Sequence, residues 1–398
     1  MRIDRYIAPP SAPPRGPWRQ PLWALGFRPF FLVAALLAAL WLPLWLHVFF
    51  SHGRMALGVE PLAWHAHEMA FGFAGAVLAG FLLTAVRNWT KLSTPAGGWL
   101  AALTLLWFLG RVAMLVGGAL PTLLVASIDS AFLPAVALAV GLPIVRSRNR
   151  RNYAVPLLLL ALSAVNVAFH AGESGLSRSA LIVAIEILAV FLVFVGGRVI
   201  PFFTRNALPG VRVTSRAWLD WTALGTTLAV PVAQLLALGL ATDVLALAAA
   251  AANLARLVGW NPVATRGKPI LWVLHVGYAW LVVGFAMLGL GRWVPALGGS
   301  APLHALTVGA LGTLILGMIA RVGLGHTGRP LVVARAITVA FVMLTAAALV
   351  RVVLPLVLPE LTTVALITSG SLWALAFLIY VIVYWPILSR PRVDGAPG

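Results

Sequence analysis

The sequence predicts an all-α polytopic membrane protein with about 12 transmembrane helices. Apolar residues make up 61% of the chain, charged residues only 10%, and the mean hydropathy is +0.99. A soluble domain contains roughly 25% charged residues, so an ordinary globular fold is excluded. A bilayer-spanning helix needs about 20 apolar residues. The 398 residues therefore leave little room for anything beyond these spans.

Apolar runs separated by short polar breaks define the individual helices. The breaks between the third and fourth, seventh and eighth, and eleventh and twelfth spans are so short that each pair is expected to form a hairpin. The polar signal is weakest between the seventh and eighth spans, where only the neighbourhood of Asp243 is polar. The predicted spans are residues 25–48, 66–86, 98–117, 121–144, 153–170, 179–203, 217–239, 242–259, 269–289, 302–322, 332–357 and 361–388.

The net charge of +18 is concentrated in alternate loops, which indicates membrane topology rather than a surface for nucleic acid. Both termini are predicted to be cytoplasmic, because the basic loops and both ends of the chain then fall on one side. Residues 1–21, with six prolines and four arginines, are expected to be a disordered basic arm. Residues 22–390 would form a single transmembrane domain, and residues 391–398 a flexible tail. The arginines and lysines of the basic loops are Arg87, Lys91, Arg146, Arg148, Arg150, Arg151, Arg205, Arg212, Arg216, Arg266, Lys268, Arg329 and Arg335.

Cysteine is absent from the sequence. This excludes disulfides, iron–sulfur clusters, covalently attached c-type haem and thiolate copper sites. Any metal must be held by histidine, methionine, carboxylate or backbone oxygen.

Six of the eight histidines fall at or near the outer ends of predicted spans. Imidazole is the usual ligand for haem iron, and for copper when thiolates are missing. His65 and His67 point about 200° apart on a regular helix. Either they belong to two different sites, or an irregular first turn lets both face inward. We predict metal ligation by His65, His67, His170 and His304. Interfacial hydrogen bonding is the alternative, and it is favoured for His47 and His52.

Four ionisable residues are predicted to lie inside the membrane at the level of these histidines. An intramembrane charge is a functional candidate by default. We expect Glu68 and Glu186 to carry protons, and Arg111 to neutralise a haem propionate. A structural ion pair of Arg111 with Asp129 or Glu186 is the alternative. Asn166, one turn before His170, is a candidate to orient that imidazole.

Two further histidines lie toward the cytoplasmic side. His275 occurs within WVLHVGYAW and His326 within GLGHTGRP. Both are candidates for binding a cofactor at a second, inner site, whereas packing or a loop position is the alternative.

An internal repeat is suggested by two predicted spans that begin with a histidine. HEMAFGFAGAVLAG starts at His67 and HALTVGALGTLILG at His304, and both have glycine five, eight and thirteen residues after the histidine. A four-helix unit repeated three times would place the second, sixth and tenth spans in equivalent positions. The glycines favour close helix packing, with a neighbouring flat macrocycle as the alternative.

Several long motifs resemble the NnrS family. They are LWALGFRPFFL (22–32), WHAHEM (64–69), AGFLLTAV (79–86), GRVIPFFTRNALPG (197–210), LHVGYAWL (274–281) and HALTVGALGTLILGMIARVGLGHTGRPL (304–331). Arg87, in TAVRNW, stands where the family pattern leads us to expect proline. By this resemblance, the family's histidine motifs are occupied by His65, His67, His275, His304 and His326, and the NVAFH segment that ends at His170 resembles another.

The resemblance implies a multi-pass protein of the bacterial inner membrane that contains non-covalent haem, of b type, and copper. It implies a role in nitric oxide metabolism and relief of nitrosative stress in denitrifying and pathogenic bacteria. A haem–copper centre of nitric oxide reductase type would reduce nitric oxide to nitrous oxide and need an electron donor. Nitric oxide binding or sensing, cofactor delivery, and secondary transport are the alternatives. The lipid bilayer and nitric oxide are the expected partners, and nucleic acid is not.

Overall fold

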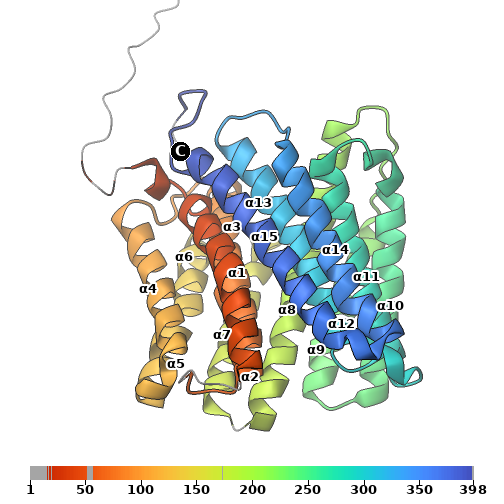
Figure 1. The fold of residues 1–398 in the computed structure, drawn as a ribbon. Helices are drawn as coiled ribbons and strands as arrows, with labels where there is room; N and C mark the ends of the chain where they lie inside the picture. Colours follow the sequence, from red (N-terminus) through yellow and green to blue (C-terminus); the bar gives the residue numbers. More distant parts are fainter. Residues whose placement is uncertain (1–15, 17, 19, 52–56, 173, 397–398) are drawn as a thin grey trace, which may run out of the picture.

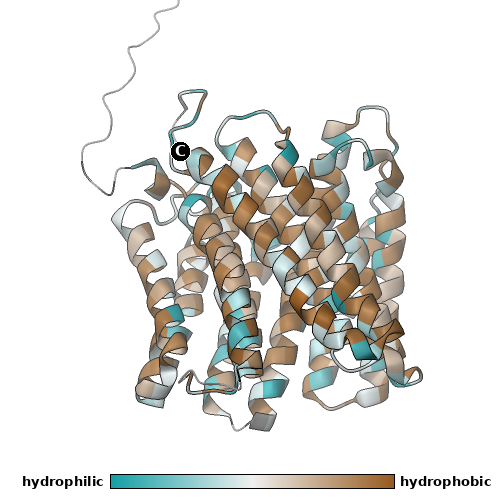
Figure 2. Ribbon diagram, in the orientation of Figure 1, coloured by the Kyte–Doolittle hydropathy of each residue, from teal (hydrophilic) through white to brown (hydrophobic). Residues whose placement is uncertain are grey.

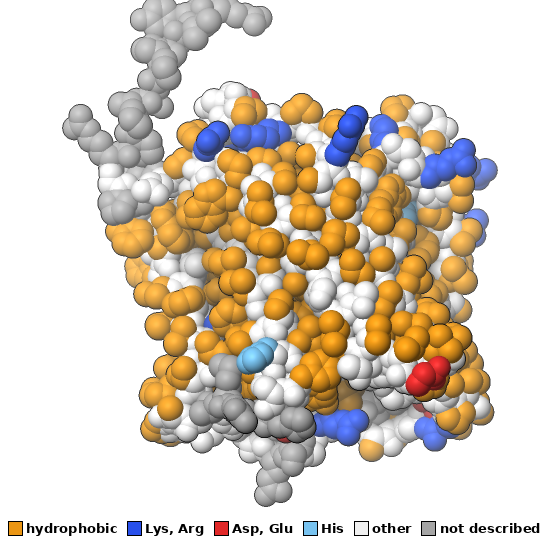
Figure 3. Space-filling view, viewed as in Figure 1, with side chains coloured by type: hydrophobic (Ala, Val, Ile, Leu, Met, Phe, Trp, Pro, Cys, Tyr) orange, Lys and Arg blue, Asp and Glu red, His pale blue; other side chains and the backbone are white. Residues whose placement is uncertain are grey.

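The computed structural model describes residues 16, 18, 20–51, 57–172 and 174–396, and these form an all-α bundle (Figure 1). Strands are absent from the described residues. Eleven of their helices are long and apolar enough to cross a membrane. Apolar side chains cover the flank of the bundle between its two ends, as lipid contact requires (Figures 2 and 3). The chain is therefore a polytopic membrane protein.

Each predicted span has a counterpart in the structure. The second and tenth are composite, because a π-helical segment interrupts each of them. The elements are α1 (Phe27–Phe50), α2 (Pro61–His67), η3 (Glu68–Ala74), α3 (Gly75–Thr90), α4 (Gly98–Leu115), α5 (Thr122–Ser130), α6 (Phe132–Arg146), α7 (Ala154–Ala171), α8 (Ser174–Ala207), α9 (Ala217–Leu235), α10 (Gly239–Gly259), α11 (Pro269–Leu290), α12 (Ala301–His304), η8 (Ala305–Gly312), α13 (Thr313–His326), α14 (Arg335–Val357) and α15 (Thr362–Leu388).

Helix α9 is less apolar than the other helices that occupy predicted spans. This helix has 19 residues and occupies the predicted span 217–239, but it is not among the eleven apolar helices. Its sequence includes Asp220 and Gln234 along with several threonines, which lowers its hydropathy. The weakly predicted break after it is real, since α9 ends at Leu235 and α10 begins at Gly239.

The two ends of the described chain lie at the same end of the bundle (Figure 1). A row of lysine and arginine side chains follows that end, as the predicted topology requires (Figure 3). Most of the predicted arm at 1–21 lies outside the described residues. In the predicted tail at 391–398, Arg392 donates to the His326 carbonyl over 3.1 Å and the Val393 amide to the Thr327 carbonyl over 3.2 Å. Residues 397 and 398 lie outside the described part.

The second, sixth and tenth spans form the centre of the bundle. In the most apolar window of each, 78%, 78% and 72% of residues are buried, compared with 33% for the span that contains α7. The π-helical segments η3 and η8 directly follow His67 and His304. The second and tenth spans therefore share a structural irregularity as well as a glycine pattern, whereas α8 is α-helical over its described length. π-Helical segments occur frequently at functional sites.

The glycines of the repeated pattern are packing positions. A Cβ atom on Gly72 would lie 2.9 Å from the Arg111 guanidinium, one on Gly309 2.6 Å from Trp280, and one on Gly312 2.3 Å from Trp373. None of these glycines lines a cavity described below. Close approach of neighbouring side chains explains them, as the packing interpretation predicts.

A buried polar network joins α8, α9, α10 and α11. Arg256 donates through Nε to Asp220 Oδ1 at 2.9 Å and through Nη1 to the Tyr278 hydroxyl at 2.8 Å. Tyr278 donates in turn to Asn253 Oδ1. The Arg256 guanidinium lies against the backbone of Gly197, where an added Cβ would be 1.5 Å from Nη2. Any side chain at position 197 must displace the arginine from this network.

Gly197→Ala is therefore expected to destabilise the protein by about 1–3 kcal/mol, the usual cost of overpacking a filled core. Gly225→Ala is the matched control, because Gly225 lies in α9 with nothing within 4 Å of its added Cβ. That change should be neutral or stabilise by about 0.5–1 kcal/mol. Unfolding by sodium dodecyl sulfate in mixed micelles measures both. Equal stability of the two variants would mean that Arg256 has room to move.

Candidate metal centre and adjoining cavity

The histidines of WHAHEM belong to two different places in the structure. Because α2 is a regular helix up to His67, His65 and His67 point in different directions. His67 lies in a fully buried polar cluster, and His65 lines a large cavity. Of the two arrangements considered from the sequence, the structure shows the one in which the pair is divided.

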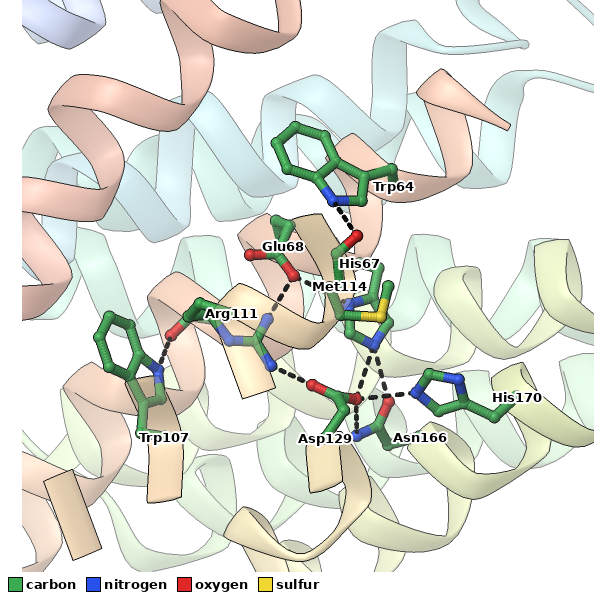
Figure 4. Close-up of polar contacts among 10 residues, drawn as sticks. Trp64, His67, Glu68, Trp107, Arg111, Met114, Asp129, Asn166 and His170 are labelled. Carbon is green, nitrogen blue, oxygen red and sulfur yellow. Dashed lines mark hydrogen bonds and ion pairs between the residues drawn. The ribbon is translucent and has the colours of Figure 1, made fainter. Parts of the chain in front are cut away.

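Asp129, on α5, lies at the centre of the buried cluster (Figure 4). Its Oδ2 atom accepts from Asn166 Nδ2 at 2.9 Å and lies 2.8 Å from His170 Nε2 and 3.1 Å from His67 Nε2. Its Oδ1 atom accepts from Arg111. The Asp129 carboxylate thus connects its own helix, α5, with α2, α4 and α7.

Both ring nitrogens of His67 face hydrogen-bond acceptors. Nδ1 is 3.3 Å from Glu68 Oε1, and Nε2 is 2.9 Å from Asn166 Oδ1. A neutral imidazole carries only one N–H group. In neutral His67, one ring nitrogen would therefore point its lone pair at an oxygen, without a hydrogen between the two atoms. A second proton on the ring, or a bound metal ion, would remove this repulsion.

The charges in the cluster also leave room for a cation. Arg111 pairs with both Glu68 and Asp129, so one positive charge faces two buried carboxylates. With neutral imidazoles the cluster carries a net charge of minus one in a region where isolated charge is costly. A proton on His67 or a singly charged metal ion would balance it.

Three donor atoms of the cluster are arranged as metal ligands require. One ligand atom from each of His67, Asp129 and His170 lies within 4.8 Å of the others. Imidazole and carboxylate are ligands that suit copper when thiolates are absent. Asn166 contacts both His67 and Asp129, and orients these two groups toward each other. The donor set therefore fits copper.

Two tryptophans brace the backbone around this cluster (Figure 4). Trp107 donates through its indole nitrogen to the Gly72 carbonyl within η3 at 2.9 Å. Trp64, directly before His65, donates to the Met114 carbonyl at 3.2 Å. These bonds tie α2 and η3 to α4, which also carries Arg111.

The large cavity has a volume of about 970 Å³ and lies beside the cluster. His170 belongs to both, because its ring contacts Asp129 and also lines the cavity. Both π-helical segments contribute to the wall, through Met69 of η3 and Thr307 of η8 among others. The remaining wall is mainly aliphatic and aromatic.

Two histidines that line this cavity, His65 and His304, each have a ring nitrogen that makes no hydrogen bond to a described residue. His65 stacks on Trp45 with ring centroids 4.1 Å apart, and its Nδ1 atom has no hydrogen-bond partner among the described residues. His304 Nδ1 is 2.7 Å from the Ser300 carbonyl, which can only accept, so this nitrogen carries the proton. Its Nε2 is then left with a free lone pair, the form in which imidazole binds a metal.

The cavity fits a haem on three grounds. Its volume is large enough for a macrocycle of this size, at the upper end of usual ligand pockets. His65 and His304 supply imidazole nitrogens without competing partners. Arg178 and Arg351 line the same space and would neutralise carboxylate side groups.

Neither Arg111 nor Glu186 is among the residues that line the cavity, and the two have different surroundings. Arg111 does not line the cavity; its partners are Glu68 and Asp129, so the ion pair with Asp129 is present. Glu186 is buried in α8, and neither of its carboxyl oxygens has a partner among the described residues. It lies next in sequence to Ile185, which lines the cavity.

The two inner histidines, His275 and His326, belong neither to the buried cluster nor to the large cavity. His275 Nδ1 donates to the Leu271 carbonyl at 3.0 Å, and its Nε2 is 3.4 Å from Thr204 Oγ1. His326 packs against Phe27 with ring centroids 5.6 Å apart. They are not brought together with another histidine or carboxylate among the described residues. Of the remaining histidines, His47 is exposed and His52 lies outside the described part.

Two arginines of the site, Arg178 and Arg351, were not singled out from the sequence. Arg351 is a charge within the predicted span 332–357, and the rule that intramembrane charges are functional candidates would have found it. Asp129 was considered as an intramembrane carboxylate and as a partner for Arg111, but nothing in the sequence indicates that it joins two histidines from different helices.

A protein-family model described as NnrS protein matches residues 21–392, nearly the whole chain. No curated protein shows significant similarity to it.

Proposed function

The chain belongs to the NnrS family, and we propose that it is a haem- and copper-binding protein of the bacterial inner membrane that removes nitric oxide. The observation that carries this proposal is the division of His65 and His67. One lines a cavity of haem size, the other lies in a buried metal-ligand cluster, and His170 contacts both places. Haem and copper held side by side through one sequence motif would suit a reaction that joins two small molecules.

Within the cavity, His65 and His304 would hold the haem iron, and Arg178 and Arg351 would pair with the propionates. Bound haem would supply a one-electron store, and it would offer nitric oxide a coordination position only where one of the two imidazoles is not on the iron. The apolar wall excludes water from that position. Trp45 fixes the ring plane of His65 by stacking, which limits the directions in which this ligand can point.

Within the buried cluster, His67, His170 and Asp129 would hold copper. Arg111 keeps the Asp129 carboxylate directed at the two imidazoles, because it binds the oxygen that they do not use. Glu68 is committed to Arg111 and contributes charge balance. Glu186 has no such partner, and so it is the carboxyl group better suited to release and take up protons beside the cavity.

Reduction balances as two nitric oxide molecules, two electrons and two protons giving one nitrous oxide and one water. The electrons come from a donor protein or quinol and the protons pass through the chain's own carboxyl groups. Binding without turnover would use the same cavity, but it would consume neither electrons nor protons.

Nitric oxide consumption by the purified, haem- and copper-loaded protein in vesicles tests this function. An electrode follows nitric oxide, and gas chromatography follows nitrous oxide, with ascorbate and a mediator as reductant. We expect repeated turnover with two nitric oxide molecules lost per nitrous oxide formed. Uptake that stops at one nitric oxide per haem would replace reduction by binding. A colourless protein that consumes none would contradict both and favour a transporter.

A further inference from the structure

A second, smaller cavity lies at the centre of the bundle. Its volume is about 70 Å³, and it is lined by side chains of α3, α8 and α13, of α1, and of the ends of both π-helical segments. These are the three spans whose equivalence the repeat predicts. We call this cavity the central chamber.

The central chamber is apolar on every described side. Its lining consists of phenylalanine, alanine, valine, leucine, isoleucine and methionine side chains, among them Val77, Leu314 and Met318. Helical hydrogen bonds already satisfy the backbone of these segments. A water molecule inside would therefore find none of the two to four polar partners that it needs, and apolar cavities of this kind stay dry.

The central chamber adjoins the large cavity. Leu188 of α8 and Leu311 of η8 line both spaces, so these two side chains lie between them. The chamber wall also includes Ala74, the last residue of η3. The π-helical segments η3 and η8 thus line both the large cavity and the central chamber.

We propose that the central chamber binds one small uncharged apolar gas molecule and exchanges it with the large cavity past Leu188 and Leu311. The volume excludes lipid chains and most organic ligands, and the lining excludes ions and water. The identification of that gas as nitric oxide rests on the proposed function. The class of ligand does not, because it follows from size and polarity alone.

Crystals of the full-length protein pressurised with xenon test this directly. Xenon occupies dry apolar cavities and is located by its anomalous scattering. We expect a xenon peak in the central chamber of the wild-type protein. Val77→Phe should remove this peak, because Val77 is buried in the wall. The matched control is Val339→Phe, since Val339 is 52% exposed on α14 and away from both cavities; it should leave the peak unchanged.

Ordered water in the central chamber, or xenon in the large cavity with none in the chamber, would overturn the proposal. A chamber peak that persists in Val77→Phe would also overturn it. If Val77→Phe does not fold, Ile315→Phe fills the same space and serves instead. Xenon binding needs neither haem nor copper, so its outcome is independent of whether the protein reduces nitric oxide.

Discussion

Arg111→Met is expected to destabilise the protein by about 3–5 kcal/mol, the cost of leaving buried charges without their partner. Glu68 and Asp129 are both fully buried, and Arg111 is the cation that pairs with them. Methionine has a similar length but no charge, so two carboxylates would face each other in an apolar region. Unfolding by sodium dodecyl sulfate in mixed micelles measures the change.

The control for this variant is Arg292→Met. Arg292 also pairs with an aspartate, Asp243, but its side chain is 50% exposed, so the loss should be no more than about 1 kcal/mol. Adding Glu68→Gln and Asp129→Asn to Arg111→Met removes the stranded charges and should restore part of the stability. Equal losses in the Arg111 and Arg292 variants would show that the buried cluster is solvated.

His65→Ala and His304→Ala are expected to lower the haem content of the purified protein by at least about tenfold, because losing even a supporting contact of a metal ligand costs about 10–100-fold in affinity. The two imidazoles line one cavity, and their free nitrogens have no role in the described hydrogen bonds. The Soret absorbance per protein measures haem, and the elution volume in size-exclusion chromatography shows whether the variants remain folded.

His47→Ala is the matched control for the haem measurement. His47 belongs to the same end of the bundle but is exposed at the end of α1 and lines neither cavity. This variant should keep the wild-type Soret band. Full haem content in both His65→Ala and His304→Ala would exclude the large cavity as the haem site.

The membrane architecture could be predicted from the sequence because apolar length and the polar breaks between the spans largely determine it. Every predicted span has a helix at its place, including the hairpin of α9 and α10 that only one aspartate indicated. The π-helical segments could not be predicted, since η3 and η8 contain no proline and their glycines are compatible with an α-helix, as the glycines of α8 show. Their shared position was visible only as a glycine pattern.

The sequence predicted four metal-ligating histidines and left open whether His65 and His67 share one site. In the structure, His67 lies in the buried cluster, His65 and His304 line the cavity, and His170 belongs to both. The 200° separation on a helix allowed this division, but which face would meet which helix depends on tertiary packing. Asp129 shows the limit most clearly, because its partners come from α2, α4 and α7.

In the proposed function, the neighbouring histidines of one motif, His65 and His67, serve two different sites. Iron and copper analysis of purified His65→Ala and His67→Ala, alongside the wild type, distinguishes these sites. We expect His65→Ala to lose haem iron and keep copper, and His67→Ala to lose copper and keep haem iron. Loss of the same metal from both variants would contradict the division and return His65 and His67 to a single centre.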